Sequence, residues 1–172
     1  PGKTRGTGMH VSRKLTADGG AGPNEAQALY RSVIAAMSEG VVVHDGEGLI
    51  EAFNASALKI LGLTEGELLG RTSRDPRWRS VREDGSDFPG EDHPVMVTLR
   101  TGEGVRGVLM AIQTPADETR WIRINSEPVA FDAAGKVVKA VATFADVTAE
   151  REAMRRMEAA VAAAARANEA KS

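Results

Sequence analysis

The sequence predicts an α+β domain built around one antiparallel sheet. Two short apolar runs come first along the chain, several short helices follow them, and three longer apolar runs close the domain. The short, turn-like connections between the last three runs favour antiparallel neighbours over parallel strands joined by helices. With 172 residues, 42% of them hydrophobic, the chain is long enough for one ordinary domain with extensions.

The chain divides into three parts by composition. Residues 1–23 are rich in glycine and small polar residues and lack apolar periodicity, which predicts a flexible tail. Residues 24–147 are expected to form the folded domain, which opens with an amphipathic helix that Asn24 caps. Residues 148–172 predict a long C-terminal helix.

Five strands are expected, each a run of β-branched and other apolar residues bounded by turn residues. They span residues 41–45, 49–53, 105–114, 120–129 and 137–147. Asp45 and Gly46 between the first two runs form a strong hairpin signal. The last three strands have one clearly apolar face and one mixed face. We expect the N-terminal helix, from this chain or from a partner, to cover the mixed face.

Start signals between the second and third strands predict short helices. Asn54 and Thr64 are helix-capping residues, and the glutamate three residues after Thr64 completes a capping box. Proline at a first helical position predicts a helical turn after Asp75 and a longer helix from Pro94. Residues 80–93 are expected to form a loop.

The C-terminal helix has the pattern of a short coiled coil. Thr148 is expected to cap it, and ten of its 25 residues are alanine, the best helix former. Its apolar residues repeat every seven positions, and Met154, Met157 and Val161 are expected to contact a partner helix in a homodimer. The alternative is a helix that docks on its own domain or frays.

Composition excludes several classes of protein. The part over 24–147 carries nineteen acidic against thirteen basic residues, which argues against nucleic-acid binding. Without cysteine the chain has no disulfide, no Cys-ligated zinc or iron–sulfur cluster and no thiol nucleophile. No apolar run approaches the roughly 20 residues that span a bilayer, and the N-terminus has no secretory signal. A cytoplasmic location is therefore expected.

Several short motifs follow one another in a characteristic order over about residues 28–150. They lie at residues 40–45 with 48–50, 54–57, 61–62, 69–70, 120–122 and 146–148. In this order they resemble a PAS domain of the bacterial signalling type, as in sensor histidine kinases and cyclic-dinucleotide enzymes. The resemblance implies a five-stranded antiparallel sheet with helices folded over one face to enclose a pocket. It also implies that Asp146 and Thr148 transfer a signal from the sheet to the C-terminal helix.

Strand alternation and the resemblance together indicate the residues of the pocket. Ile122, Ile124 and Ser126 share one face of their strand, and the resemblance places the strand position of His44 at the ligand cavity of flavin-binding relatives. A buried imidazole can bind a ligand or respond to pH, and it can equally be a core histidine bonded to backbone; both readings stay open. The expected pocket residues are Val42, His44, Met96, Leu99, Met110, Ile122, Ile124, Ser126 and Phe144.

The sequence indicates no particular metal or cofactor. His93 beside two carboxylates is a weak metal signal, and hydrogen bonding within its loop is favoured. The cysteine-based photochemistry of light-sensing relatives is excluded because the chain has no cysteine. His44, His93 and Met96 are each able to ligate haem iron, but none has a diagnostic context, so haem is not expected.

Two functional hypotheses remain. The sequence has no nucleophile–base set, two-histidine metal motif or phosphate-binding loop, so a regulatory module rather than an enzyme is expected. The first hypothesis is a sensory module that binds a small ligand and transmits a conformational change through its C-terminal helix to an effector domain. The second is a ligand-free dimerisation or interaction module whose pocket is packed shut.

Overall fold

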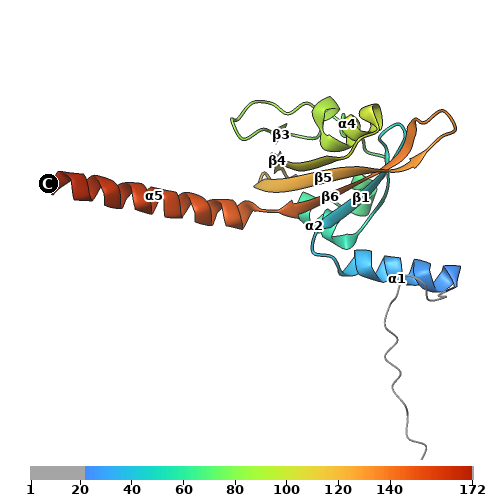
Figure 1. Ribbon diagram of the computed structural model, residues 1–172, viewed down its shortest axis with the longest axis horizontal. Coiled ribbons are helices and arrows are strands. Elements are labelled where there is room, and N and C mark those ends of the chain that lie inside the picture. The colour runs from blue at the N-terminus through green and yellow to red at the C-terminus, as the bar shows by residue number, and fades with distance from the viewer. Residues whose placement is uncertain (1–21, 172) are drawn as a thin grey trace, which may run out of the picture.

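Six strands form one antiparallel sheet in the computed structural model, which describes residues 22–171 (Figure 1). In order across the sheet they are β2 (Ile50–Phe53), β1 (Gly40–Asp45), β6 (Val137–Asp146), β5 (Thr119–Phe131), β4 (Val105–Gln113) and β3 (Ser80–Val81). The last strand in the chain, β6, pairs with the first, β1, and so joins the N-terminal hairpin to the C-terminal meander in one sheet.

The prediction of five strands was wrong by one. The sixth strand, β3, has only two residues and lies within the segment expected to be a loop. Ser80 pairs with Ile112 and Val81 with Ala111. A two-residue strand carries no alternation, and therefore no signal that a pattern analysis detects.

Three short helices cover one face of this sheet. They are α2 (Ala55–Leu61), α3 (Glu65–Leu68) and α4 (Pro94–Thr101), and a 3-10 turn, η1 (Gly90–Asp92), precedes α4. Their buried residues, such as Leu61, Leu68 and Val95, join one core cluster with alternate residues of the strands. That core face includes Val42 and Phe144, as alternation predicted.

The helix caps predicted at Asn54 and Thr64 are present, whereas the cap predicted at Asn24 is wrong, because the N-terminal helix begins at Pro23 and its cap residue is Gly22. The Asn54 side chain accepts a hydrogen bond from the Ala57 N–H at 2.9 Å, and α2 ends at Gly62 in the left-handed conformation, φ 67°. Thr64 and Glu67 form the reciprocal capping box at the start of α3. The turn of helix expected after Asp75 is wrong: this segment forms turns only.

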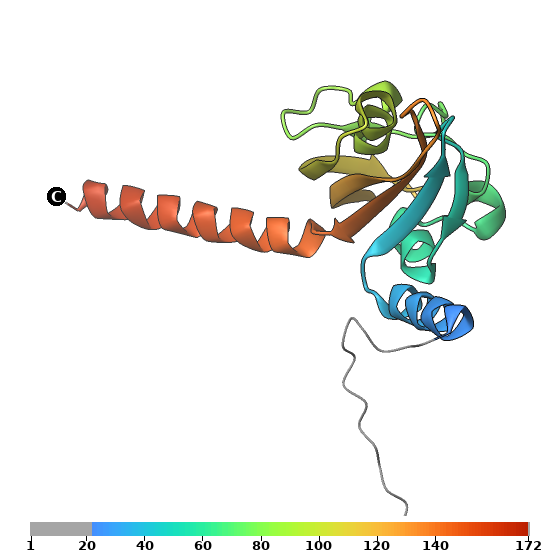
Figure 2. The same cartoon turned by 45° about the vertical axis from the view of Figure 1, so that its right-hand side comes forward.

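The N-terminal helix α1 (Pro23–Ala36) begins after Gly22 and lies away from the sheet, below α2 in Figures 1 and 2. Its apolar side chains are exposed, among them Leu29, Tyr30, Val33 and Ile34. The expectation that this helix covers the mixed face of its own sheet is therefore wrong, and cover by a partner's helix stays a prediction. The predicted tail lies, up to residue 21, outside the described residues.

The C-terminal helix α5 (Thr148–Ala170) continues directly from β6 and projects away from the domain (Figures 1 and 2). None of its residues is buried, and Met154, Met157 and Val161 are each more than half exposed. The capping role expected of Thr148 is wrong: it is the first helical residue, and the cap residue is Val147. The carboxylate of Asp146 instead accepts from the Thr148 N–H at 3.0 Å.

Candidate functional site

A small cavity lies between the core face of the sheet and the segments that cover it. Its volume is about 70 Å³. The other strands contribute mainly apolar side chains to its wall, the short edge strand β3 adds Ser80, and the covering segments add Ser73, Trp78 and His93. The cavity is lined by Val42, His44, Ile50, Leu61, Ser73, Trp78, Ser80, His93, Val95, Met110, Ile112, Ile122, Ile124, Ala142 and Phe144.

The structure brings together six of the nine predicted pocket residues at this cavity. These are Val42, His44, Met110, Ile122, Ile124 and Phe144. Met96 and Leu99 lie instead in a surface groove beside Gly46 and Glu47, because the face of α4 that touches the cavity is the one bearing Val95. Ser126 is buried but does not line the cavity, and its hydroxyl has no hydrogen-bond partner among the described residues.

His44 is held on β1 by the turn that follows it. Its Nδ1 lies 3.1 Å from the backbone oxygen of Gly48. A carbonyl only accepts, so Nδ1 carries the proton and the neutral ring keeps a lone pair on Nε2. Burial lowers the pKa of His44, opposed by the Gly48 bond and by the nearby carboxylates of Asp45 and Glu51. The neutral imidazole is therefore both a backbone-bonded core residue and part of the cavity wall.

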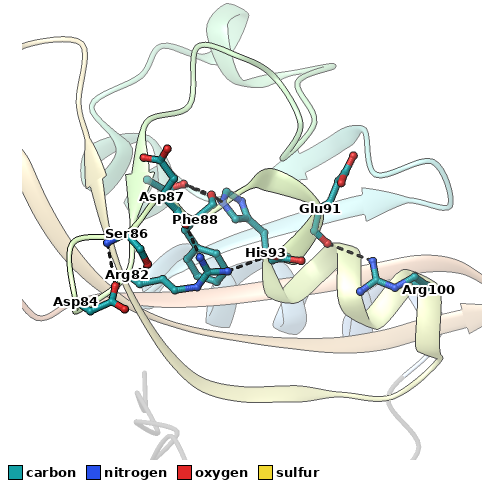
Figure 3. Close-up of polar contacts among 10 residues, drawn as sticks. Arg82, Asp84, Ser86, Asp87, Phe88, Glu91, His93 and Arg100 are labelled. Atoms are coloured by element: carbon teal, nitrogen blue, oxygen red, sulfur yellow. Dashed lines mark hydrogen bonds and ion pairs between the residues drawn. The ribbon is translucent and has the colours of Figure 1, made fainter.

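His93 joins β3 and the segment after it to the start of α4 (Figure 3). Its Nε2 lies 2.9 Å from the Ser80 hydroxyl and 3.2 Å from the backbone oxygen of Phe88. The Ser80 hydroxyl donates to the same Phe88 oxygen at 3.0 Å, so a neutral His93 that donates to Ser80 satisfies all three groups. Burial lowers the pKa of His93 as well. This is the loop bonding favoured from the sequence, and no cluster of three potential metal ligands occurs within residues 22–171.

The segment before His93 is tied together by charged and aromatic side chains. The Arg82 guanidinium lies 4.5 Å from the centre of the Phe88 ring (Figure 3). It is also paired with Asp92 at 3.0 Å. The Phe88 ring meets the His93 ring edge-on at 5.2 Å. The sequence did not indicate His93 and Ser80 as cavity residues, because they belong to a segment without regular alternation. Ile112 was also absent from the predicted pocket, although alternation along β4 places it on the same face as Met110, two residues earlier.

The cavity is small for an organic ligand. At about 30 Å³ per water molecule, 70 Å³ holds about two waters. Sites for drug-sized molecules measure about 300–1,000 Å³. A larger ligand therefore requires side chains of the wall, such as Trp78 or Phe144, to move.

The wall of this cavity continues directly into the base of α5. Ile122 and Phe144 line the cavity, and Ile122 pairs with Asp146 across the two strands. The Asp146 carboxylate accepts hydrogen bonds from the Thr148 N–H at 3.0 Å and from the Thr148 hydroxyl at 2.6 Å. That hydroxyl accepts in turn from the N–H of Trp121 at 2.9 Å. The start of α5 is thus bonded to β5 and β6, two of the strands that line the cavity.

Arg151 forms a second contact at the base of α5. Its guanidinium lies 4.1 Å from the centre of the Trp121 ring, and its Nη1 lies 2.8 Å from the Glu83 carboxylate. Glu83 belongs to the loop that follows β3, which extends toward α5 in Figure 1. Arg151 therefore connects the helix to β5 and to the segment that ends at His93.

A family model described as a PAS domain matches residues 38–149, more than half of the chain. This chain belongs to the PAS domain family. The match covers the sheet, its covering helices and the junction with α5. The match confirms, at the level of family and fold, the resemblance inferred from the sequence motifs. PAS domains are regulatory modules that sense signals. No curated protein sequence matches the chain.

Solved PAS structures share this fold at low sequence identity. The PAS domain of a protein from Colwellia psychrerythraea is 14% identical, with a TM-score of 0.54 over 72% of this chain and 98% of that one. The PAS domain of an HTR-like protein from Haloarcula marismortui is 19% identical, with a TM-score of 0.53 over 72% and 93%. An RNA-binding light-oxygen-voltage receptor is 18% identical, with a TM-score of 0.61 over 90% of this PAS chain but 43% of the receptor. Within residues 22–171 no helix has the length and apolar character to cross a membrane.

Proposed function

We propose that this PAS domain is a sensory module that binds a small ligand at the histidine-lined cavity and transmits the event through Asp146 and Thr148 into α5. The observation that carries the proposal is the shared wall: Ile122 lines the cavity and pairs with Asp146, which bonds the first residue of α5. A displacement of the strand at the cavity therefore acts on the helix one residue pair away. Population shift between two arrangements of the helix would carry the signal.

The chemistry of the cavity limits what it binds. A lone pair on His44 Nε2 offers one acceptor in a wall that is otherwise mostly apolar. The volume suits a molecule of a few heavy atoms, and a larger ligand would have to open the wall. We infer a neutral or donor-bearing small molecule rather than a bulky cofactor.

Native mass spectrometry of the purified chain and thermal unfolding across a panel of small metabolites test the binding step. A ligand of the cavity should raise the unfolding temperature, and Ala142→Leu, which adds bulk to the cavity wall, should abolish the rise. Ala111→Leu is the matched control, because Ala111 is equally buried but on the opposite face of the sheet. No ligand in either experiment, or equal loss in both variants, would remove the cavity from the proposal.

The second hypothesis, a ligand-free dimerisation or interaction module, is favoured by the small cavity volume. In both hypotheses the chain forms a homodimer through Met154, Met157 and Val161, in the cytoplasm and ahead of an effector domain. Their exposure along one heptad seam of α5 supports this pairing. Sedimentation should show that truncation after Val147 or Met157→Glu gives a monomer, whereas Ala159→Glu, on the outer face of the heptad, does not. A monomeric full chain would end the pairing argument.

A further inference from the structure

An arginine whose guanidinium forms no hydrogen bond with the described residues lies at the edge of the core, in a cleft next to the cavity described above. The side chain of Arg71 is only 5% exposed. Its guanidinium lies 4.7 Å from the centre of the Trp78 ring, and its Nε is buried without a hydrogen-bond partner among the described residues. The burial of an unpaired charge is unfavourable, so a cation held in this way is normally paired with an anion.

The two carboxylates that act on the Arg71 charge, those of Asp75 and Glu67, are both engaged in hydrogen bonds elsewhere. Asp75 lies 3.9 Å from Arg71 Nε, which is beyond hydrogen-bond distance. The same carboxylate forms a bidentate pair with Arg77, at 2.9 Å to Nε and 2.6 Å to Nη2. The Arg77 cation and its hydrogen bonds hold the pKa of Asp75 well below its ordinary value. Asp75 therefore forms its hydrogen bonds with Arg77, and Arg71 keeps only a long ion-pair contact with this carboxylate.

Arg71 lines a surface cleft of about 530 Å³, a volume typical of small-molecule sites. The cleft lies between the start of α3, the segment before β3 and the turn between β4 and β5. Apolar side chains form part of its wall, among them Leu63, Trp78 and Pro115. Its lining residues are Leu61, Leu63, Glu67, Arg71, Pro76, Arg77, Trp78, Arg79, Gln113, Thr114, Pro115 and Asp117.

Two of the three arginines that line this cleft form fewer side-chain hydrogen bonds than its two acidic residues do. Glu67 accepts from the Thr64 N–H and hydroxyl, both at 2.9 Å, within the capping box of α3. Asp117 accepts from the Gln113 amide at 2.8 Å. Arg79, by contrast, forms no side-chain hydrogen bond or ion pair with any residue of the described chain. Both acidic side chains thus accept hydrogen bonds, whereas the guanidinium groups of Arg71 and Arg79 donate none to the described residues.

We propose that this cleft binds a small organic oxyanion, whose carboxylate or phosphate group pairs with Arg71 and Arg79 while its apolar part contacts Leu63 and Pro115. Guanidinium groups present donors in the geometry that carboxylates and phosphates accept. This site is separate from the cavity proposed above, although Leu61 and Trp78 line both. An anion in the cleft would therefore touch the outer side of the cavity wall.

The two tryptophan indoles allow a direct test on the unaltered chain by two-dimensional NMR. Trp78 lines the cleft and donates its indole N–H to the Thr72 carbonyl at 2.8 Å, whereas Trp121 lies at the base of α5. Titration with inorganic phosphate and with succinate, at constant ionic strength, should shift the Trp78 indole signal saturably and leave that of Trp121 in place. Succinamide is the neutral control and should have no effect. A response to phosphate alone or to succinate alone identifies which oxyanion group binds.

Variants separate a site from general charge attraction. Arg79→Gln should weaken binding about tenfold or more, because a charge-assisted hydrogen bond is lost. Arg106→Gln is the matched control: Arg106 is 80% exposed and pairs with Glu127 outside the cleft. Arg71→Gln should abolish binding, and Arg79→Gln decides the question if Arg71→Gln fails to fold. No saturable shift with either anion, an equal shift with succinamide, or equal weakening by the Arg79 and Arg106 variants would overturn the proposal.

Discussion

Replacement of Arg151 by alanine should loosen the base of α5 without unfolding the PAS domain. The change removes a guanidinium that lies 4.1 Å from the Trp121 ring and 2.8 Å from Glu83. A partly buried cation–π contact contributes about 1 kcal/mol. The ion pair adds about 0.5 kcal/mol at most, because the Glu83 side chain is 62% exposed. The buried Nε of Arg151 has no hydrogen-bond partner, so its removal offsets part of this loss.

A net loss of about 1 kcal/mol corresponds to a roughly fivefold rise in local opening. Hydrogen–deuterium exchange of the amides at 151–155 in α5 should therefore accelerate by about that factor, while exchange in β1 stays unchanged. Glu83→Gln should give a smaller acceleration at the same amides, since it removes the ion pair alone. The double variant should accelerate exchange by less than the product of the two single effects.

Arg155→Ala is the matched control for this experiment. Arg155 lies one turn further along α5 and is exposed, and its side chain forms no hydrogen bond or ion pair with any residue of the described range. It undergoes the same change in helix propensity, so propensity cancels between the two variants. Equal acceleration in both variants would refute the idea that Arg151 holds the helix to the domain.

Three further predictions concern stability. Burial lowers the pKa of His44, so the neutral ring contributes fully to stability above about pH 6.5 and less as the pH falls below that value. Urea unfolding at about pH 7.5 and about pH 5.5 should show that His44→Gln loses less free energy of unfolding between the two pH values than the wild type does. An equal loss in both proteins would contradict this direction of the pKa shift. Gly40→Ala should lower the free energy of unfolding by about 1–3 kcal/mol, because the added Cβ would overlap the Phe144 ring. Gly66→Ala is the control: its Cβ would meet no atom within 4 Å, so the change should be neutral or stabilising in the same urea unfolding. Equal losses in the two variants would argue against the clash with Phe144. Asn54→Ala should lose about 2–4 kcal/mol, since four side-chain hydrogen bonds disappear; a loss below about 1 kcal/mol would show that the backbone groups find other partners.

Local chemistry decided how far the sequence could predict the fold. Asn54 and Thr64 were identified because a capping side chain acts on backbone within three residues, so its signal is local. Strand alternation likewise assigned Val42 and Phe144 to the core face. The helical turn predicted after Asp75 was wrong, because proline is common both at the first position of a helix and in tight turns. Here the Asp75 carboxylate bonds the Arg77 N–H at 2.9 Å and no helix follows.

The candidate site was predictable where it lies on strands and not where it lies on the irregular segment. Alternation places Ile122 with Ile124 and His44 with Val42, since neighbours two apart share a face, and the resemblance to PAS domains placed the position of His44 at the cavity. His93 reaches the cavity only because β3 pairs with β4 and η1 leads into α4, and both are long-range consequences of packing. The pairing state of Arg71 is equally invisible in the sequence, because it depends on the competition between Arg71 and Arg77 for Asp75.

The length of α5 changes the scale on which this domain works. At about 1.5 Å per residue, its 23 residues extend about 35 Å beyond the sheet. A tilt of about 5° at the base displaces the first turn by about 0.5 Å and the far end by about 3 Å. The contacts of Asp146, Thr148 and Arg151 fix the base of α5, so a small tilt there becomes a larger displacement at its far end. Under the proposed function, a cavity that holds only a few atoms is sufficient, because the displacement needed in the first turn of α5 is about 0.5 Å, smaller than a bond length.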